Sequence, residues 1–229
     1  MTARPSAGAV VALVPAAGRG VRLGAGTPKA FARLHGRPLL WHAVGGLLGS
    51  GCVDRVVVAV AGSDRVLAAT ALDDVTERVR IVTGGTERSD SVRAALEAVT
   101  DADIVLVHDA ARCLIPPSVI RSVVDAVRAG HRAVVPVLPC SDTVKQVDDH
   151  GTVITTVDRA VLRVAQTPQG FDADLLRRAY ATGGGHATDD AELVERLGEA
   201  VTTVAGHPRA FKITTPFDLA VAEAVAGAP

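Results

Sequence analysis

Short apolar runs alternate with segments of helical periodicity along most of this chain. Several runs are apolar at every position, as in VVVAV at 56–60 and IVLV at 104–107, which is typical of strands covered on both faces. The strands that we expect are Ala9–Val14, Arg55–Ala61, Val79–Thr83, Ile104–His108, Ala133–Leu138, Val201–Val204 and Phe211–Thr214. The helices that we expect are Leu39–Leu48, Asp64–Leu72, Ser89–Val99, Pro117–Ala129, Asp172–Ala181, Asp189–Leu197 and Pro216–Val225. The alternation predicts an α/β protein with a doubly wound, mostly parallel, Rossmann-like sheet.

Size and charge narrow the class of protein further. The 229 residues are 48% hydrophobic, which suits a single domain over 1–229 with a substantial core. The formal net charge of −1 provides no overall field to attract nucleic acid or an anionic membrane. No apolar run approaches the roughly 20 residues of a membrane span, and no signal peptide is expected. The three cysteines show no metal-binding spacing, so we expect a cytoplasmic protein that binds neither nucleic acid nor membrane.

One segment departs from the alternation. Residues 141–160 read SDTVKQVDDHGTVITTVDRA, with Val- and Thr-rich runs on both sides of DDHG. Asp149–Gly151 suits a β-turn, so we expect a β-hairpin inserted in the α/β domain. Since the hairpin has little apolar mass to bury against the sheet, we expect an arm that projects and pairs with a second copy of the chain, in a homodimer. The alternative is an ordinary surface hairpin.

The loop after the first strand reads VPAAGRGVRLGAGTPKAF, at 14–31. A dinucleotide-binding loop requires Gly-x-Gly-x-x-Gly, but Leu23 takes the place of the third glycine. The acidic residue about twenty positions further on is also missing, since the first one in the chain is Asp54. A P-loop requires Gly-Lys followed by Ser or Thr, whereas Lys29 lies between Pro28 and Ala30. Neither familiar nucleotide loop is present.

The same loop still has features that suit a phosphate-rich ligand. Small residues let backbone N–H groups approach an anion or a base closely, and we take Pro15, Ala16, Ala17, Gly18 and Gly20 as candidate nucleotide-binding residues. Arg22 and Lys29 are two cations on a Gly- and Pro-rich loop, which suits a triphosphate whose α-phosphorus is attacked, because fixed cations stabilise the developing charge. They are the candidate catalytic residues. The alternative for the loop alone is a plain connection between strand and helix.

Further motifs follow in order along the chain. They are TGGTERSDSV at 83–92, VHDAAR at 107–112, DTVK at 142–145, TVDR at 156–159, QTPQGF at 166–171, TDDA at 188–191 and FKITTPFDL at 211–219. Together with the loop at 14–31, they resemble the 2-C-methyl-D-erythritol 4-phosphate cytidylyltransferase family of the non-mevalonate isoprenoid pathway. The resemblance spans essentially the whole chain and implies a nucleotidyltransferase fold.

The resemblance implies roles on the nucleotide side of the site. It places Arg88, Asp90 and Ser91 near the cytidine, with Ser91 on the base or ribose, and adds Gly84 and Ala110 as nucleotide-binding residues. Helix capping alone is the alternative for Asp90 and Ser91, and Ser89 is a plausible N-cap of the helix that follows. The resemblance also implies that Asp109 binds both the metal ion and the substrate. A carboxylate at a strand end beside a triphosphate suits Mg²⁺.

The resemblance implies roles for the second substrate as well. Arg112 and Lys212 would contact the methylerythritol phosphate. Thr143 and Arg159, on the arm, would bind the phosphate in the neighbouring subunit of the dimer. Thr167 and Thr188 would lie near the substrate, with purely structural roles as the alternative. His108 is expected to be structural rather than a general base.

The activity implied by the resemblance is the transfer of CMP from CTP to 2-C-methyl-D-erythritol 4-phosphate. The substrate phosphate would attack the α-phosphorus in line, and pyrophosphate would leave with Mg²⁺ bound. We see no Ser/His/Asp or Cys/His set for a covalent intermediate. Two alternatives remain: a cytidylyltransferase for another polyol phosphate, such as ribitol 5-phosphate, and a non-catalytic nucleotide-binding module.

Overall fold

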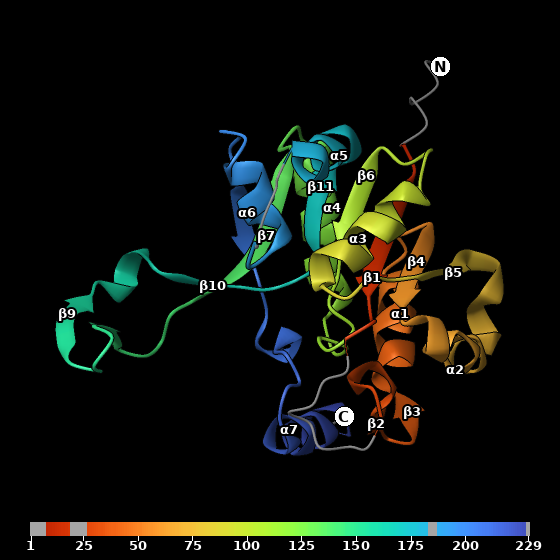
Figure 1. Ribbon diagram of the computed structural model, residues 1–229, viewed down its shortest axis with the longest axis horizontal. Helices are drawn as coiled ribbons and strands as arrows, with labels where there is room; N and C mark the ends of the chain where they lie inside the picture. The colour runs from red at the N-terminus through yellow and green to blue at the C-terminus, as the bar shows by residue number, and fades with distance from the viewer. Residues whose placement is uncertain (1–7, 19–26, 183–186, 228–229) are drawn as a thin grey trace.

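The computed structural model describes residues 8–18, 27–182 and 187–227 (Figure 1). Among these residues an eight-stranded sheet runs in the order β10-β7-β11-β6-β1-β4-β5, and β12 also pairs with β7. The strands are β1 (Val10–Pro15), β4 (Arg55–Val60), β5 (Val79–Thr83), β6 (Ile104–Val107), β7 (Ala133–Pro139), β10 (Arg163–Ala165), β11 (Gln169–Asp172) and β12 (Thr202–Ala205). Six of the seven expected strands are therefore present, within a residue or two of their expected ends.

Most pairs in the sheet are parallel. β1 lies parallel to β4 and β6, β4 to β5, and β7 to β12. β11 runs antiparallel between β6 and β7, and β10 runs antiparallel to β7. The expectation of a mostly parallel sheet is confirmed, with two short antiparallel strands that the sequence pattern did not reveal.

Helices cover both faces of this sheet, as a doubly wound fold requires. Val10, Ala12 and Val14 of β1 pack in one buried cluster with α1 (Leu39–Gly49), α2 (Arg65–Ala71) and α4 (Pro117–Arg128). Val11 and Leu13 point to the opposite face, because successive side chains of a strand alternate. There they pack with α3 (Arg88–Glu97), α5 (Ala173–Thr182) and α6 (Asp190–Glu195). The fully apolar strands thus bury both faces.

A small third cluster lies below the sheet in Figure 1, around α7 (Pro216–Ala226) and the short strands β2 (Arg33–Leu34) and β3 (Arg37–Pro38). Leu34, Cys113 and Ile213 are buried in it. Burial raises the pKa of the Cys113 thiol to about 12, so that it stays protonated. Thr215 caps α7 by accepting a hydrogen bond from the Asp218 backbone N–H.

The arm is a hairpin of β8 (Val144–Val147) and β9 (Val153–Val157), and it extends away from the body of the molecule (Figure 1). Its turn is closed by the Asp148 carboxylate, which accepts hydrogen bonds from the backbone of His150 and Thr152 at 3.0 and 2.8 Å. Gly151 has a φ of 81°, which a glycine adopts without strain. The hairpin predicted at 141–160 is confirmed as an element and as a projection.

Two local expectations are wrong. Phe211–Thr214 is not a strand but an extended loop after the 3-10 turn Pro208–Ala210; its Ile213 N–H donates to the Ala111 carbonyl instead of to a sheet neighbour. The apolar residues that suggested a strand are buried in the third cluster. The N-cap of α3 is Glu87 rather than Ser89, in a capping box with Asp90. No helix in the described part of the chain is long and apolar enough to cross a membrane.

Candidate active site

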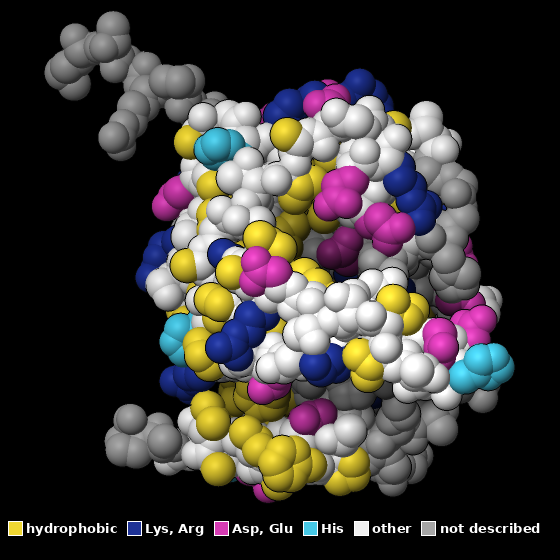
Figure 2. All heavy atoms as spheres, turned by 90° about the vertical axis from the view of Figure 1, so that its left-hand side faces the viewer, with side chains coloured by type: hydrophobic (Ala, Val, Ile, Leu, Met, Phe, Trp, Pro, Cys, Tyr) yellow, Lys and Arg dark blue, Asp and Glu magenta, His cyan; other side chains and the backbone are white. Residues whose placement is uncertain are grey.

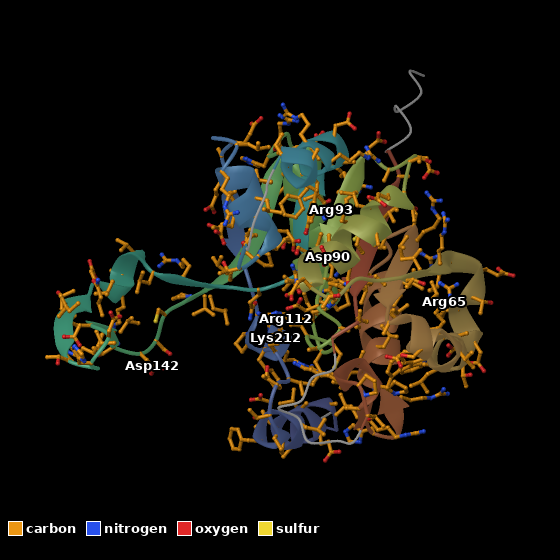
Figure 3. The ribbon with its side chains drawn as sticks, viewed as in Figure 1. Arg65, Asp90, Arg93, Arg112, Asp142 and Lys212 are labelled. Carbon is orange, nitrogen blue, oxygen red and sulfur yellow. The ribbon has the colours of Figure 1, made fainter. Side chains whose placement is uncertain are left out.

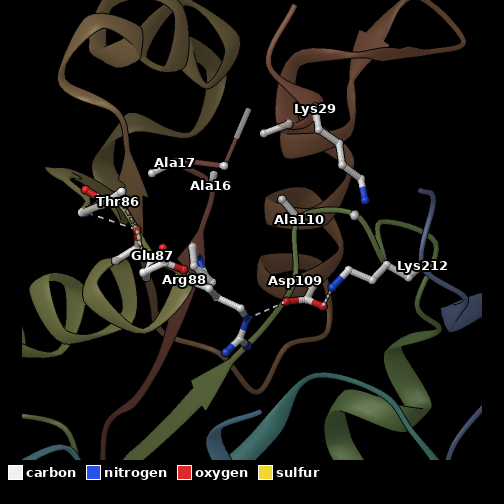
Figure 4. Close-up of a pocket in the computed structure, with 15 residues that line it drawn as sticks. Ala16, Ala17, Lys29, Thr86, Glu87, Arg88, Asp109, Ala110 and Lys212 are labelled. Carbon is white, nitrogen blue, oxygen red and sulfur yellow. Dashed lines mark hydrogen bonds and ion pairs between the residues drawn. The ribbon is translucent and has the colours of Figure 1, made fainter. Parts of the chain in front are cut away.

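A pocket of about 240 Å³ opens where β1 and β6 end. This is the carboxyl edge of the parallel strands, where open α/β sheets bind ligands. Small side chains and backbone form one wall, and charged side chains converge from the others (Figure 4). The lining residues are Pro15, Ala16, Ala17, Gly18, Lys29, Ala30, Gly85, Thr86, Glu87, Arg88, Ser91, Asp109, Ala110, Ala111 and Lys212.

One wall of this first pocket is the turn that leads from β5 into α3. The Gly85 backbone N–H donates to the Ser91 hydroxyl oxygen at 3.2 Å. A Cβ atom at Gly85 would stand 2.3 Å from the Cβ of Asp90, and one at Gly84 would stand 2.7 Å from the Ser91 oxygen. Asp90 in turn accepts from the Glu87 backbone N–H at 3.2 Å. The turn therefore requires glycine at both positions because its own helix packs against it.

Asp109 lies at the centre of the charged groups. Its carboxylate contacts Lys212 Nζ at 2.9 Å, Arg88 Nε at 3.2 Å and Arg112 Nε at 3.7 Å. Burial would raise the pKa of Asp109, but Arg88 and Lys212 outweigh it and hold this pKa far below its usual value. The carboxylate is thus ionised at neutral pH and lies between Arg88 and Lys212, two cations from distant parts of the chain (Figure 4).

His108 precedes Asp109 and is fully buried. Its Nδ1 lies 3.0 Å from the Thr167 hydroxyl, which also accepts a hydrogen bond from the Asp109 backbone N–H at 3.0 Å. Burial lowers the pKa of His108 to about 4. His108 is therefore neutral at pH 7, and both it and Thr167 fix the backbone that carries Asp109.

A second pocket, of about 260 Å³, shares Arg88, Asp109 and Lys212 with the first. Its lining residues are Arg88, Asp109, Arg112, Ala165, Gln166, Thr167, Gln169, Thr188, Asp189 and Lys212. Arg112 is held at its edge by the carbonyl of Ala210, to which Nη1 donates at 2.8 Å. Two adjoining pockets with a common charged wall can hold two ligands whose reacting atoms meet at that wall.

Most of the residues singled out from the sequence line one of the two pockets. The first is lined by Pro15, Ala16, Ala17, Gly18, Lys29, Ser91 and Ala110, the second by Arg112, Thr167 and Thr188, and both by Arg88, Asp109 and Lys212. Gly84 and Asp90 support the first pocket from behind. Gly20 and Arg22 lie outside the described residues.

The two arm residues are the exception. Thr143 and Arg159 lie on the projecting arm, and neither lines either pocket of its own chain. The Arg159 guanidinium donates instead to the Ser141 carbonyl at 2.6 Å, within the arm. Figure 3 shows Asp142, at the base of the same hairpin, well apart from Arg112 and Lys212. These two residues therefore contribute to neither pocket of their own chain in this structure.

Sequence reasoning missed several lining residues. Ala30, Gly85, Thr86, Glu87 and Ala111 adjoin predicted residues in the first pocket, and Ala165, Gln166, Gln169 and Asp189 do so in the second. Gln166 and Gln169 belong to the motif QTPQGF, and Asp189 to TDDA. The motifs were thus the available signal, but they did not show which of their side chains face the cavity.

Asp109 fits poorly as a ligand of Mg²⁺. Oδ1 contacts Arg88 and Oδ2 contacts Lys212 and Arg112, so both oxygens already face positive groups. A divalent ion at this carboxylate would lie beside those cations. Among the residues that the structure describes, no group of three or more His, Cys, Asp or Glu side chains is placed to hold a metal ion.

Comparison with known proteins decides between the families that could use such a site. The family model described as IspD, 2-C-methyl-D-erythritol 4-phosphate cytidylyltransferase, matches residues 10–227. The chain belongs to this family. It is 62% identical over 221 residues to the 2-C-methyl-D-erythritol 4-phosphate cytidylyltransferase of Saccharopolyspora erythraea, with 94% of this chain and 98% of the relative covered. The protein of the same name from Nocardia farcinica is 62% identical over 216 residues, covering 94% of this chain and 93% of the relative.

Solved structures of the family have the same fold. The 2-C-methyl-D-erythritol 4-phosphate cytidylyltransferase of Thermus thermophilus is 37% identical and superposes with a TM-score of 0.82, covering 96% of this chain and 100% of that one. The 4-diphosphocytidyl-2C-methyl-D-erythritol synthase of Anaerococcus prevotii is 27% identical, with a TM-score of 0.85 and coverage of 96% and 99%. The predicted nucleotidyltransferase fold is confirmed, and the chain is an enzyme of the cytidylyltransferase class.

Proposed function

We propose that this enzyme transfers the cytidylyl group of CTP to 2-C-methyl-D-erythritol 4-phosphate. The products are 4-diphosphocytidyl-2-C-methyl-D-erythritol and pyrophosphate. Membership of the family supports the reaction, and the observation that carries it in this structure is the pair of adjoining pockets with Arg88, Asp109 and Lys212 as their common wall. Two anionic substrates must meet in this reaction, and the cations of that wall favour their approach. Since CTP is a cytoplasmic nucleotide, a cytoplasmic location is proposed as well.

CTP is proposed to occupy the first pocket. The backbone at Ala16–Gly18 and the turn at Gly85–Ser91 leave room for the base and the ribose, while Lys29 and Lys212 face the phosphates. Lys29 lies on the short 3-10 turn Lys29–Phe31 and points toward Lys212 across the pocket (Figure 4). Gly20 and Arg22 are proposed to complete this side, on the sequence argument alone.

The polyol phosphate is proposed to occupy the second pocket. Arg112 and Lys212 provide positive charge for its phosphate, and Thr167, Thr188 and Asp109 provide polar groups for its hydroxyls. A phosphate oxygen of this substrate attacks the α-phosphorus of CTP as the bond to pyrophosphate breaks. A phosphate monoester has a second pKa of about 6, so the nucleophile is already largely ionised at neutral pH and needs no general base. The neutral, buried His108 is consistent with that.

Catalysis is then mainly positioning and charge stabilisation. Negative charge increases on the non-bridging oxygens of the α-phosphate and on the leaving pyrophosphate. Lys29 and Arg22 are proposed to stabilise it, since preorganised cations in a pocket act without reorganisation of solvent.

Mg²⁺ remains the expected cofactor, but the two Asp109 oxygens are already engaged by Arg88 and Lys212. Mg²⁺ in such enzymes is commonly held by substrate phosphates with few protein ligands. We therefore propose that the ion enters with CTP. If so, the Mg²⁺ concentration for half-maximal rate should track the CTP concentration, and Asp109→Asn should leave that relation unchanged even where it slows the reaction.

The arm supports a homodimer. Val147, Val153 and Ile154 are 50%, 54% and 60% exposed on the two strands of the hairpin, and a group of exposed apolar side chains marks an interaction surface. Hydrophobic side chains also gather at the lower end of the face from which the arm projects, where α7 lies (Figure 2). We propose that two copies exchange arms, and that Thr143 and Arg159 reach the second pocket of the partner.

The test is an assay of the purified chain with CTP and 2-C-methyl-D-erythritol 4-phosphate, following pyrophosphate release with and without Mg²⁺. Release that requires both substrates supports the proposal. Ribitol 5-phosphate is offered in parallel, and a higher kcat/KM with it would assign the enzyme to a different polyol phosphate. CTP binding without release of pyrophosphate in the presence of either acceptor would indicate a non-catalytic module.

A further inference from the structure

We propose that Asp190 is a positioning residue of this enzyme: it fixes Arg88, and through Arg88 the wall shared by the two pockets, with Tyr180 as its second support. Asp190 is the first residue of α6 and is fully buried. Its Oδ2 lies 2.7 Å from Arg88 Nη2, and its Oδ1 accepts a hydrogen bond from the Tyr180 hydroxyl at 2.6 Å. Both oxygens are therefore used, and α5, α6 and α3 meet at one carboxylate.

The contact with Asp190 fixes the orientation of the Arg88 guanidinium, and this orientation matters for both substrates. Arg88 donates from Nη2 to Asp190 and from Nε to Asp109. A guanidinium is planar and rigid, so holding it at these two atoms sets the direction of the remaining corner, Nη1. Because Arg88 lines both pockets, its orientation affects the nucleotide and the polyol phosphate together. Asp109 is in turn held by Arg88 on one oxygen and by Lys212 on the other.

A role in α6 alone does not account for this carboxylate. The N-cap of α6 is Asp189, which accepts from the Glu192 backbone N–H at 3.0 Å and from the Gln169 amide at 2.8 Å. Asp190 instead points away from its own helix end, to residues in α3 and α5. Burying a carboxylate is costly, and an ion pair at such a place is weak evidence for added stability. The buried Asp190 carboxylate instead contacts Arg88, a residue that lines both pockets, so its role is to orient that side chain.

Tyr180 is suited to hold the Asp190 carboxylate in place. It is the single tyrosine of the chain and is buried. Burial and the Asp190 charge raise the pKa of its phenol far above the usual value, so the hydroxyl is protonated and can donate at neutral pH. The Arg93 guanidinium stacks 5.9 Å from the ring centroid on its other side. The phenol therefore has one fixed acceptor, the Asp190 carboxylate.

The inference rests on the proposed function, since it is measured in that reaction. Asp190→Asn keeps the shape but removes the charge that pairs with Arg88, and the charge-assisted bond it loses is a strong one. We expect kcat/KM to fall by about tenfold to a hundredfold for both substrates. Tyr180→Phe retains the Asp190–Arg88 pair and should lower kcat/KM by about two- to fivefold.

Asp172→Asn is the matched control. This carboxylate pairs with Arg132 and caps α5 without contact to Arg88, so the substitution should lower the melting temperature and leave kcat and KM unchanged.

A double-mutant cycle separates positioning from a purely structural role. If Asp190 acts through Arg88, Asp190→Asn should cost little more activity in an Arg88→Met background, where no cation is left for Asp190 to orient, and the same holds for Tyr180→Phe. Equal losses in both backgrounds, or unchanged kcat and KM in the folded variants, would overturn the proposal. Should Asp190→Asn not fold, the cycle with Tyr180→Phe decides. Calorimetric binding of CTP to each variant gives a readout that survives if the wild-type chain proves inactive toward both polyol phosphates.

Discussion

Charge balance at single residues decides how this site works. Asp109 is buried and ionised because Arg88 and Lys212 pair with it, with Arg112 nearby. These cations are therefore partly neutralised before any substrate arrives. Lys29 lines the same pocket, across from Arg88 (Figure 4), and with Arg22 it is the group that we expect to meet charge created during the reaction.

Lys29→Ala should accordingly impair the chemical step more than binding. Removing one preorganised donor to a developing oxyanion costs about 3–4 kcal/mol, or two to three orders of magnitude in kcat. KM for the polyol phosphate should change little by comparison. Arg65→Ala is the control, because Arg65 lies on α2, away from the pockets (Figure 3), and bonds to Thr83. Near-normal kcat in the purified Lys29→Ala enzyme would remove Lys29 from the catalytic group.

His108 should make the fold sensitive to mild acid. Its pKa falls from 6.5 to about 4 on folding because the ring is buried, so the unfolded chain binds an extra proton between these values. Stability is then full above pH 6.5 and decreases as the pH falls toward 4, by on the order of 3 kcal/mol. Urea denaturation at pH 7 and pH 4.5 should show this loss, and His108→Asn should reduce it. His131→Asn, at an exposed ring, should leave it in place; equal pH dependence in all three proteins would contradict the assignment.

The sequence predicted which residues belong to the site better than it predicted which residues contact one another. Lys29, Asp109, Arg112 and Lys212 were named from motifs, and all four line a pocket. Asp190 was present only as a letter of the motif TDDA, with no role predicted for it, because its bond to Arg88 spans 102 positions in the chain. Long-range pairing of this kind depends on how α5 and α6 pack on α3, which a local pattern does not encode.

Among the elements, the turn between β5 and α3 links folding to the site most directly. It must pass between the helix it precedes and the pocket it lines, so Gly84 and Gly85 lie against Ser91 and Asp90. The same two side chains hold the turn and the first residues of α3 by hydrogen bonds. The stability of the helix N-terminus and the shape of the nucleotide pocket are therefore set together.

Gly85→Ala tests this coupling. The added Cβ would stand 2.3 Å from Asp90 Cβ, so the turn or the capping box must shift. Overpacking of this kind costs about 1–3 kcal/mol, and CTP affinity should fall with it, as measured by thermal unfolding and calorimetry. Gly45→Ala is the control: it lies inside α1 with nothing within 4 Å, and alanine there should stabilise the helix by about 0.5–1 kcal/mol. Unchanged CTP binding in Gly85→Ala would show that the turn adapts.

The elements that the sequence missed share a physical reason. β11 is four residues long and includes a glycine, and β10 has three residues; neither has the apolar run that identifies a strand. β11 pairs with β6 and β7, and β10 pairs with β7, so both strands form through partners that are distant in the sequence. At Phe211–Thr214 a strand was predicted but is absent, because the apolar residues of this segment are buried against helices and loops rather than in the sheet. Burial alone does not distinguish a strand from a buried loop.

For the whole molecule, the alternation of strands and helices predicted a parallel sheet between two layers of helices. The site lies at the edge of this sheet where several parallel strands end. β1, β5 and β6 end at one edge, and the loops that follow them carry Ala16, Arg88 and Asp109 to the same pocket. The sequence alone could not give the distances within that pocket. It did predict the arm, because a hairpin with few apolar residues has no place in the core.

The arm leads to the last prediction, on how two copies share their sites. If Arg159 serves the partner's pocket, a heterodimer of one Lys29→Ala subunit and one Arg159→Ala subunit contains one intact site, formed by the unaltered pocket of one chain and the unaltered arm of the other. Purified through two different tags, it should show about half of the wild-type turnover per dimer, although each variant alone is nearly inactive.

The control places both substitutions in one subunit and pairs it with a wild-type chain. Under arm exchange, the wild-type pocket then receives the altered arm and the altered pocket receives the wild-type arm, so neither site is intact and activity should be nearly absent. An arm that serves its own chain predicts the reverse in both heterodimers. Sedimentation of the wild-type chain at twice its 23.5 kDa mass is the first requirement, and a monomer at micromolar concentration would contradict arm exchange before either heterodimer is made.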